Sequence, residues 1–332
     1  MITSTKTQRL FALSISSILL AGFAPSAFAG APNITPGQCG SMDIAFVIDT
    51  TGSMGGEIAN IQTGFNQIIT DAQLASQGNQ LRLGLVEVTG GKPDPFVGGP
   101  SIQPDYVAVH WPLTTNVAGV QASINALTAT FGGQFPEATD QGKATVLQLR
   151  APGMYPDGTG FMGQVVSDPA NAPGGFNAPF TANTKIAILV TDDAAGGFND
   201  VADAADDALI QSLGTTAFGL GIKMSDLYSG TAANPNDAIA SAQLQADAAN
   251  SGGVFMQINP DGTGAASAIM SIIADCGGDG GSPVGGEFLS IDTSSLVIGG
   301  LASSAMWLAP LIAVATGTGF YFTRSLWNKP EE

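Results

Sequence analysis

The stretch "DIAFVIDTTGSM", residues 43–54, determines how the rest of the chain can be interpreted. Residues 44–48 are apolar without interruption, which is typical of a strand buried on both faces of a sheet. The strand pattern ends at Asp49, and Thr51 and Ser53 follow at alternate positions. The sequence therefore predicts a carboxylate and two hydroxyl groups at the carboxyl end of a buried strand.

Similar apolar runs alternate with helical patterns along most of the chain. We predict strands at 44–48, 81–88, 106–111, 186–190, 216–222 and 254–258, and helices at 54–75, 117–127, 137–149, 201–213, 237–250 and 265–274. No helical pattern separates the second strand from the third, so those two should form an antiparallel edge pair. The alternation predicts an α/β, Rossmann-like fold with a mostly parallel six-stranded sheet and helices on both faces.

The two ends of the chain predict export and anchoring. Residues 1–29 combine Lys6 and Arg9, an apolar run and a small-x-small site at 27–29, which is the pattern of a secretory signal; an uncleaved anchor is the alternative. Residues 277–295 form a Gly-rich linker. Residues 296–322 carry no charge and are long enough to cross a membrane, whereas a buried core helix would be unusually long.

Charge sets the predicted orientation and limits the partners. Arg324 and Lys329 follow the apolar segment, which places the tail 323–332 in the cytoplasm and the rest outside it, in a prokaryotic cell envelope. Between residues 30 and 295 the chain carries 25 acidic and six basic residues, a net charge near −19. Such a surface repels nucleic acid and anionic headgroups, so neither is an expected partner.

Cys39 and Cys276 are the two cysteines of the chain, and both lie in the exported part. In an oxidising compartment such a pair is expected to be bridged. One stands just before the first strand and the other just after the last helix, so a bridge would join the ends of one domain, residues 39–276.

A second group of carboxylates follows the fourth strand. In "IAILVTDDAAGG" the strand 186–190 leads to Asp192 and Asp193. Because parallel strands end at the same edge of a sheet, Asp192 should lie beside Asp49, Thr51 and Ser53. This set of hard oxygen ligands suits Mg²⁺, or Mn²⁺ or Ca²⁺. We expect Asp193 to orient a ligand or to face solvent.

These residues resemble the von Willebrand factor type A (VWA) domain. Its metal-ion-dependent adhesion site uses an Asp-x-Ser/Thr-x-Ser motif after the first strand, which "DTTGS" matches at residues 49–53, and an Asp after the fourth strand, which Asp192 matches. The segments "FGGQFPEATD" (131–140) and "LQADAANSGGVFMQI" (244–258) are also similar, and the resemblance covers about residues 43–274. The family's middle loop often supplies Thr or Asp, whereas here either Gln134 or Glu137 is the candidate ligand.

Other interpretations remain open at this point. The "DTTGS" turn could simply cap the following helix. Asp200, Asp203 and Asp207 share a helix face that is expected to be solvated. His110 is the only histidine and has no apparent nucleophile beside it, which argues against His-dependent triads and His-rich zinc sites.

The expected function is a membrane-anchored, extracytoplasmic module that binds a protein ligand or mediates adhesion, and not an enzyme. A carboxylate from the partner would complete the metal site. Two alternatives are an assembly subunit of an envelope complex and, from another class, a hydrolase using Asp49, Asp192, Asp193 or Glu137 around the metal.

Two Gly/Pro-rich segments could take part in partner binding. The hairpin 89–105 should turn at the metal edge, with Lys92 and Phe96 as partner contacts, unless it is an inert connector. The longer segment 151–184 is expected at the opposite edge.

Overall fold

The computed structural model describes residues 34–102, 105–130, 136–156, 162–199, 201–230 and 234–278. The predicted signal sequence 1–29, the apolar segment 296–322, the tail 323–332 and nearly all of the linker lie outside these residues. Within them, no helix is both long enough and apolar enough to cross a membrane.

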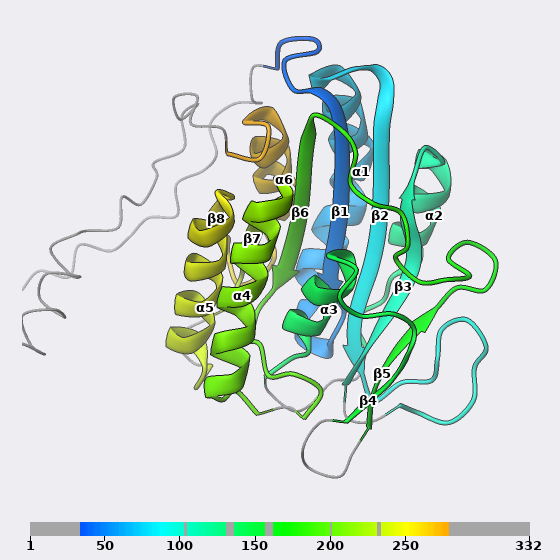
Figure 1. Cartoon of the computed structure of the whole chain (residues 1–332), viewed down its shortest axis with the longest axis vertical. Helices are drawn as coiled ribbons and strands as arrows, with labels where there is room; N and C mark the ends of the chain where they lie inside the picture. Colours follow the sequence, from blue (N-terminus) through cyan, green and yellow to red (C-terminus); the bar gives the residue numbers. More distant parts are fainter. Residues whose placement is uncertain are drawn as a thin grey trace, which may run out of the picture.

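The described chain forms one eight-stranded sheet between two layers of helices (Figure 1). The strands are β1 (Gly40–Asp49), β2 (Ser76–Gly90), β3 (Asp105–Thr114), β4 (Gly153–Pro156), β5 (Met162–Ser167), β6 (Thr184–Thr191), β7 (Lys223–Tyr228) and β8 (Phe255–Gln257). Their order is β4-β5-β3-β2-β1-β6-β7-β8. Strands β1, β2, β6, β7 and β8 are parallel, which confirms a mostly parallel α/β sheet with β1 beside β6.

Alternate residues of β1 serve the two faces of the sheet. Ile44, Phe46 and Ile48 pack in the core under α1 (Gly55–Ala75), α2 (Val117–Ala126) and α6 (Ala265–Ala274). Ala45 and Val47 face α3 (Thr139–Val146), α4 (Ala204–Leu220) and α5 (Asp237–Ser251). This double burial explains the uninterrupted apolar sequence of β1.

The prediction of six strands was wrong, because β4 and β5 extend the sheet beyond β3. The antiparallel pairing of β2 with β3 is confirmed, but these strands are not the edge. The short β4 and β5 lie in a Gly/Pro-rich segment without a long apolar run. Strand β5 is parallel to β3, which runs antiparallel to β2.

The fifth strand was predicted at 216–222 but lies at Lys223–Tyr228. Residues up to Leu220 continue α4, which ends where Gly221 adopts a left-handed conformation with φ of 66°. Strand β7 contains the polar residues Ser225 and Asp226, both fully buried, so its sequence lacks the apolar run that marks β1.

Asp226 can be buried because it belongs to an ion-paired triad. The Lys143 ammonium of α3 lies 2.7 Å from the Asp226 carboxylate and 2.5 Å from that of Asp247 on α5. All three side chains are almost completely buried. One residue before the lysine, a Cβ on Gly142 would lie 2.7 Å from Val88, so α3 sits directly on the sheet.

We call the end of the sheet where β1 and β6 finish the carboxyl edge, and the opposite end the amino edge. The predicted disulfide between Cys39 and Cys276 is confirmed, with 5.4 Å between the two Cα atoms. It lies at the amino edge, where β1 starts.

The expected place of the segment 151–184 needs a correction. Gln164, near the start of β5, pairs with Tyr106, which in turn pairs with Thr89 near the end of β2. Pro156 at the end of β4 pairs with Met162. Strand β4 therefore ends, and β5 begins, at the carboxyl edge, and only the later part of the segment returns to the amino edge where β6 begins.

Candidate metal centre

Asp49 ends β1 and is completely buried at the carboxyl edge. Its Oδ1 accepts hydrogen bonds from the Thr51 amide at 2.9 Å and from Thr51 Oγ1 at 2.7 Å. Its Oδ2 accepts one from Thr191 Oγ1, at 2.9 Å. Burial, followed by the charge of Asp192, raises the pKa of Asp49 well above its usual range, so an isolated anion is costly here.

The structure brings Ser53 and Asp192 to the same place. Thr51 Oγ1 lies 3.5 Å from Ser53 Oγ, and the Ser53 hydroxyl hydrogen-bonds to the Asp192 carboxylate. Burial raises the pKa of Asp192, and its Oδ1 has no hydrogen-bond partner. Four sequence-predicted residues, Asp49, Thr51, Ser53 and Asp192, thus form one connected cluster.

Glu137 joins this cluster from the loop before α3. The loop is held by backbone hydrogen bonds from Glu137 N to Ala194 O and from Gly196 N to Glu137 O. Burial raises the pKa of Glu137 well above its usual range, and the charges of Asp49, Asp105 and Asp192 raise it further. Its Oε2 has no hydrogen-bond partner. The other candidate in this loop, Gln134, lies outside the described residues.

The residues present fit a hard divalent cation. Asp49 at the end of β1, Asp192 after β6 and Glu137 before α3 lie near enough for their charges to raise the pKa of Asp49 and Glu137. Asp192 and Glu137 each have an oxygen without a partner, and the hydroxyl groups of Thr51 and Ser53 lie beside Asp49 and Asp192. A cation would offset their mutual repulsion and bind the free oxygens. Nowhere in the described parts of the chain do three or more Asp, Glu, His or Cys side chains form a ready-made metal cluster, so hydroxyl groups and water would have to complete the ligand set.

Two supporting residues were not predicted from the sequence. Thr191 orients Asp49, and its position directly before Asp192 could have suggested this. Asp105, at the start of β3, hydrogen-bonds to the Glu137 side chain, and its Oδ2 accepts a 3.2 Å hydrogen bond from the Ala138 amide. No local pattern around Asp105 identifies it, because the contact depends on how β3 pairs with the sheet.

One of our two expectations for Asp193, that it faces solvent, was wrong. It is completely buried and accepts hydrogen bonds from the side chains of Asn234, at 3.0 Å, and Asn236, at 3.3 Å. It therefore ties the loop after β6 to the loop before α5, beside the candidate metal centre.

Lys92 and Phe96 both have partners within the chain. Lys92 Nζ lies 2.5 Å from Glu87 Oε1 and 3.1 Å from Thr50 Oγ1, while His110 Nε2 lies 2.7 Å from Glu87 Oε2. The Phe96 ring packs edge-on against the His110 ring, with centroids 5.0 Å apart. The buried Glu87 carboxylate thus pairs with Lys92, and whether Lys92 and Phe96 contact a partner stays a prediction.

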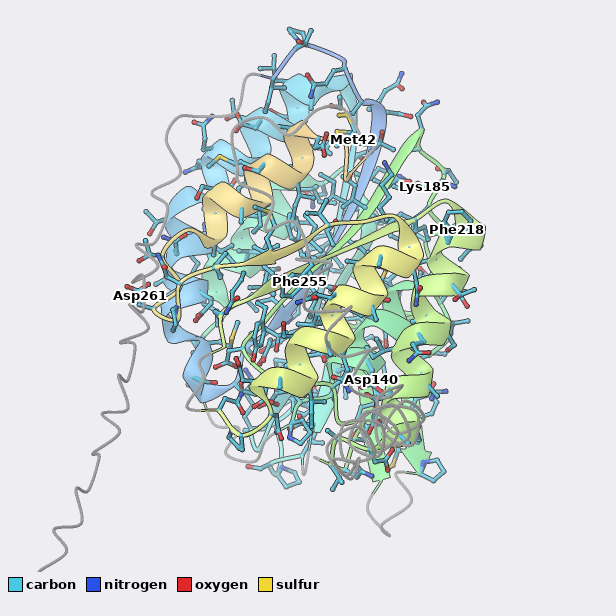
Figure 2. All side chains as sticks on the ribbon, turned by 90° about the vertical axis from the view of Figure 1, so that its left-hand side faces the viewer. Met42, Asp140, Lys185, Phe218, Phe255 and Asp261 are labelled. Atoms are coloured by element: carbon cyan, nitrogen blue, oxygen red, sulfur yellow. A yellow bond between two sulfur atoms is a disulfide. The ribbon has the colours of Figure 1, made fainter. Side chains whose placement is uncertain are left out.

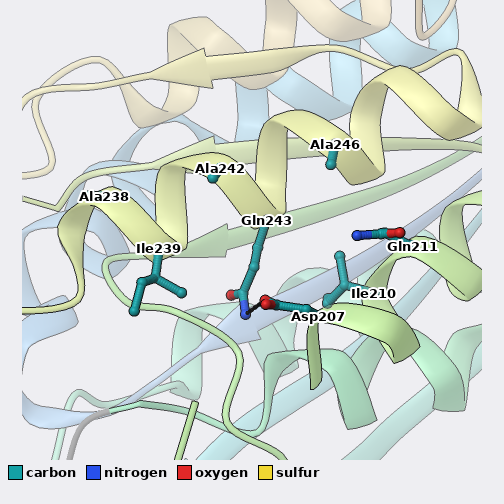
Figure 3. Close-up of a pocket in the computed structure, with 8 residues that line it drawn as sticks. All are labelled: Asp207, Ile210, Gln211, Ala238, Ile239, Ala242, Gln243 and Ala246. Carbon is teal, nitrogen blue, oxygen red and sulfur yellow. Dashed lines mark hydrogen bonds between the residues drawn. The ribbon is translucent and has the colours of Figure 1, made fainter. Parts of the chain in front are cut away.

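A separate pocket of about 350 Å³ lies between α4 and α5 (Figure 3). Its lining includes Ile210, Ile239 and Ala242, and the Gln243 side chain crosses it to donate a 2.9 Å hydrogen bond to Asp207. Asp207 is the one acidic group in its lining, so this pocket does not offer the set of carboxylates found in the candidate metal centre.

No protein-family model matches the chain, and no curated protein matches it in sequence. Several solved structures are similar. Proximal thread matrix protein 1 from the mussel byssus is 16% identical with a TM-score of 0.42, over 72% of this chain and 47% of that one. The pilus adhesin SpaC from Lactobacillus rhamnosus GG is 16% identical with a TM-score of 0.42, over 73% and 30%. The SpRpn10 VWA domain is 12% identical with a TM-score of 0.38, over 69% and 94%.

This chain thus spans less than half the length of the first two of these proteins. Likenesses at these identities and TM-scores are too weak to assign a role to this chain.

Proposed function

We propose that this chain is a VWA-type module that binds a protein partner in a manner that depends on a divalent cation. Asp49, Thr51, Ser53 and Asp192 would hold the ion, with Glu137 as the ligand from the middle loop. The observation that supports this most directly is the meeting of three buried or half-buried carboxylates, two of which have an unpartnered oxygen.

Mg²⁺ is the ion we expect, with Mn²⁺ and Ca²⁺ as alternatives, because the donors are hard oxygens. A bound ion of this kind would accept a carboxylate oxygen from the partner as a further ligand. The chain's own residues prepare the place: Thr191 and the Thr51 amide fix Asp49, Asp105 holds Glu137, and Asp193 secures the adjoining loop. Ser53 is exposed, which leaves the cluster open to solvent on that side.

Membrane anchoring belongs to the same proposal. The described domain ends near the amino edge, where the Lys223 ammonium donates a hydrogen bond to the Cys276 carbonyl at 3.2 Å. A linker leaving from that edge toward the apolar segment 296–322 would keep the candidate metal centre on the far side of the domain from the membrane. We propose a single-pass protein of the cell envelope with its domain outside the cytoplasm.

The alternatives are an assembly subunit in which the ion only stabilises the fold, and a metal-dependent hydrolase. Among the described residues of the cluster, the groups that could act as a base are the same carboxylates that would bind the ion. This arrangement favours holding an ion over activating water, so binding is the better-supported function.

Calorimetry on the purified full chain tests the proposal. The parent protein should bind Mg²⁺ or Mn²⁺, and Asp49→Ala should abolish binding at this site while circular dichroism stays unchanged. Asp261→Ala is the control, since it removes an exposed carboxylate from the loop between β8 and α6. Metal binding by Asp49→Ala equal to that of the parent would refute the site.

Partner dependence needs a second experiment. Envelope extract passed over the immobilised parent protein should yield a partner that EDTA releases and that Asp49→Ala does not retain. A partner retained equally well by both proteins and in EDTA would favour the assembly subunit. Turnover of ester, phosphate or peptide substrates would favour the hydrolase.

A further inference from the structure

The loop after β6 is bridged to Glu137 through two backbone hydrogen bonds. Glu137 N donates to Ala194 O at 2.9 Å, and Gly196 N donates to Glu137 O at 2.8 Å. The two bonds pair Glu137 with Ala195 in the manner of a parallel sheet. In such a pairing the N–H and C=O groups of Ala195 itself point away from Glu137 and need other partners.

The side chain of Gln243, on α5, supplies those partners. Its Oε1 accepts a 2.9 Å hydrogen bond from the Ala195 amide, and its Nε2 lies 3.5 Å from the Ala195 carbonyl oxygen. Ala195 is completely buried and Gln243 is 5% exposed. One side-chain amide thus takes the place of a neighbouring strand and satisfies a buried peptide group.

Asp207, on α4, fixes which way the Gln243 amide faces. Figure 2 shows α5 running alongside α4, the helix that carries the labelled Phe218. Gln243 Nε2 donates a 2.9 Å hydrogen bond to Asp207 Oδ1 (Figure 3). An ionised carboxylate can only accept, so Nε2 must face Asp207 and Oε1 must face the Ala195 amide. Because Asp207 is exposed, the orientation of a buried amide is set from the surface of the domain.

Helix α5 and the loop before it hold the same segment at a second place. The side chains of Asn234 and Asn236 donate hydrogen bonds to the Asp193 carboxylate. Asp193 directly follows Asp192, and Ala195 comes two residues later. The segment that joins two candidate metal ligands, Asp192 within it and Glu137 bridged to it, is therefore fixed from α5.

We propose that Asp207 and Gln243 are positioning residues of the candidate metal centre, an inference that rests on the proposed function. Neither side chain would touch the ion. Gln243 fixes Ala195, and Ala195 fixes the backbone of Glu137 on its other side. The affinity for the ion would thereby depend on a carboxylate at the exposed surface of α4, which is where the centre could be regulated.

Calorimetry with Mn²⁺ on the full chain tests this role. Gln243→Leu keeps the side chain close in size but removes both hydrogen-bonding ends, so the dissociation constant should rise about tenfold or more. Gln245→Leu is the matched control, because it makes the same change two residues along α5, where the amide donates to Ser241 of its own helix. Equal affinities of Gln243→Leu and the parent would overturn the proposal.

Exchanging the two functional groups gives a rescue experiment. Gln243→Glu alone places a carboxylate against Asp207 and should weaken Mn²⁺ binding. Adding Asp207→Asn should restore it to near the parental affinity, because the new carboxylate can accept from both the Ala195 amide and the new asparagine amide. The double variant also keeps the net charge of the parent. A double variant that binds as weakly as Gln243→Glu would contradict the proposal.

A further variant separates positioning from general loss of stability. Leu244 is completely buried in the core on the same helix, so Leu244→Ala should lower the melting temperature at least as much as Gln243→Leu. Its Mn²⁺ dissociation constant should nevertheless match that of the parent. Equal weakening by Leu244→Ala and Gln243→Leu would show that the effect is only a loosened fold.

Hydrogen exchange in the metal-free protein gives a readout that needs no ion. The Ala195 amide should exchange faster in Gln243→Leu than in Gln245→Leu, since its acceptor is gone. Unchanged exchange would count against the proposal.

The calorimetry also distinguishes failure of this inference from failure of the proposed function. If the parent protein binds no Mn²⁺, both fail together. If Asp49→Ala abolishes binding while Gln243→Leu binds like the parent, the metal centre stands and only the positioning role is overturned.

Discussion

Replacing Lys143 by Met should be among the most damaging single substitutions in this domain. The lysine is 1% exposed and its two carboxylate partners, Asp226 and Asp247, are not exposed at all. Removing one partner of a buried ion pair costs about 3–5 kcal/mol, a large part of the stability of a typical domain. The methionine fills the same space, so the loss should come from the uncompensated charge.

The penalty should depend on pH with a definite sign. Burial raises the pKa of Asp226 to about 7 in the folded protein. The contribution of this group to the free energy of unfolding is therefore fully present below pH 3.8 and is lost as the pH rises through 7. Without Lys143 this pKa should rise further. The variant should therefore lose about 1 kcal/mol more than the parent between pH 7 and pH 8.

Urea denaturation of the parent and of Lys143→Met at pH 5, 7 and 8 measures both effects. Lys185→Met, at a half-buried lysine that donates to the Leu220 carbonyl, is the control. Replacing Asp226 and Asp247 by Leu in the Lys143→Met background should recover much of the loss, because no buried charge remains. A single variant within about 1 kcal/mol of the parent at pH 8 would refute the reasoning, as would a triple variant that is no more stable than the single one.

Three further outcomes can be measured. The pKa of Glu87 is lowered to about 2, although burial opposes this, because His110 and Lys92 stabilise its charge. Its contribution of about 3 kcal/mol to the free energy of unfolding is present above pH 4.5 and should disappear as the pH falls toward 2. In an acid titration, Glu87→Gln should lack this pH-dependent loss. Serine at both Cys39 and Cys276 should lower the free energy of unfolding by about 5 kcal/mol in denaturant titrations, and a loss equal to that of a surface Ser substitution would contradict the entropic argument. Gly142→Ala should lower the free energy of unfolding by about 1–3 kcal/mol, since its methyl group would lie 2.7 Å from Val88 and 2.8 Å from Val47. The clash should lift α3 together with Glu137 and so weaken Mg²⁺ binding. Unchanged stability would show that α3 can shift freely.

The sequence was most informative where burial acts on both faces of a strand. Strands β1 and β6 are continuous apolar runs, and the polar residues after them were correctly placed together because parallel strands end at one edge. Strand β7 was misplaced because Asp226 interrupts its apolar sequence, and the lysine that makes this burial tolerable lies 83 positions earlier in the chain. A local pattern cannot reveal a partner that only tertiary packing supplies.

The candidate site likewise contains residues that local sequence predicts and others that only tertiary packing reveals. Asp49, Thr51, Ser53 and Asp192 follow the ends of apolar strands and could be predicted. Asp105 could not, because its contact with Glu137 depends on the antiparallel return of β3. Strands β4 and β5 were missed for a related reason: they are short, pair mainly with each other and β3, and carry little apolar sequence of their own.

The disulfide has a mechanical consequence. Tension applied to the chain beyond residue 278 would pass from Cys276 directly into Cys39, one residue before β1 begins, without loading α6. It would then run along β1, which is hydrogen-bonded to β2 on one side and to β6 on the other, as far as Asp49. Such a load would therefore be resisted in shear by two rows of backbone hydrogen bonds, along a line that joins the disulfide to the candidate metal centre.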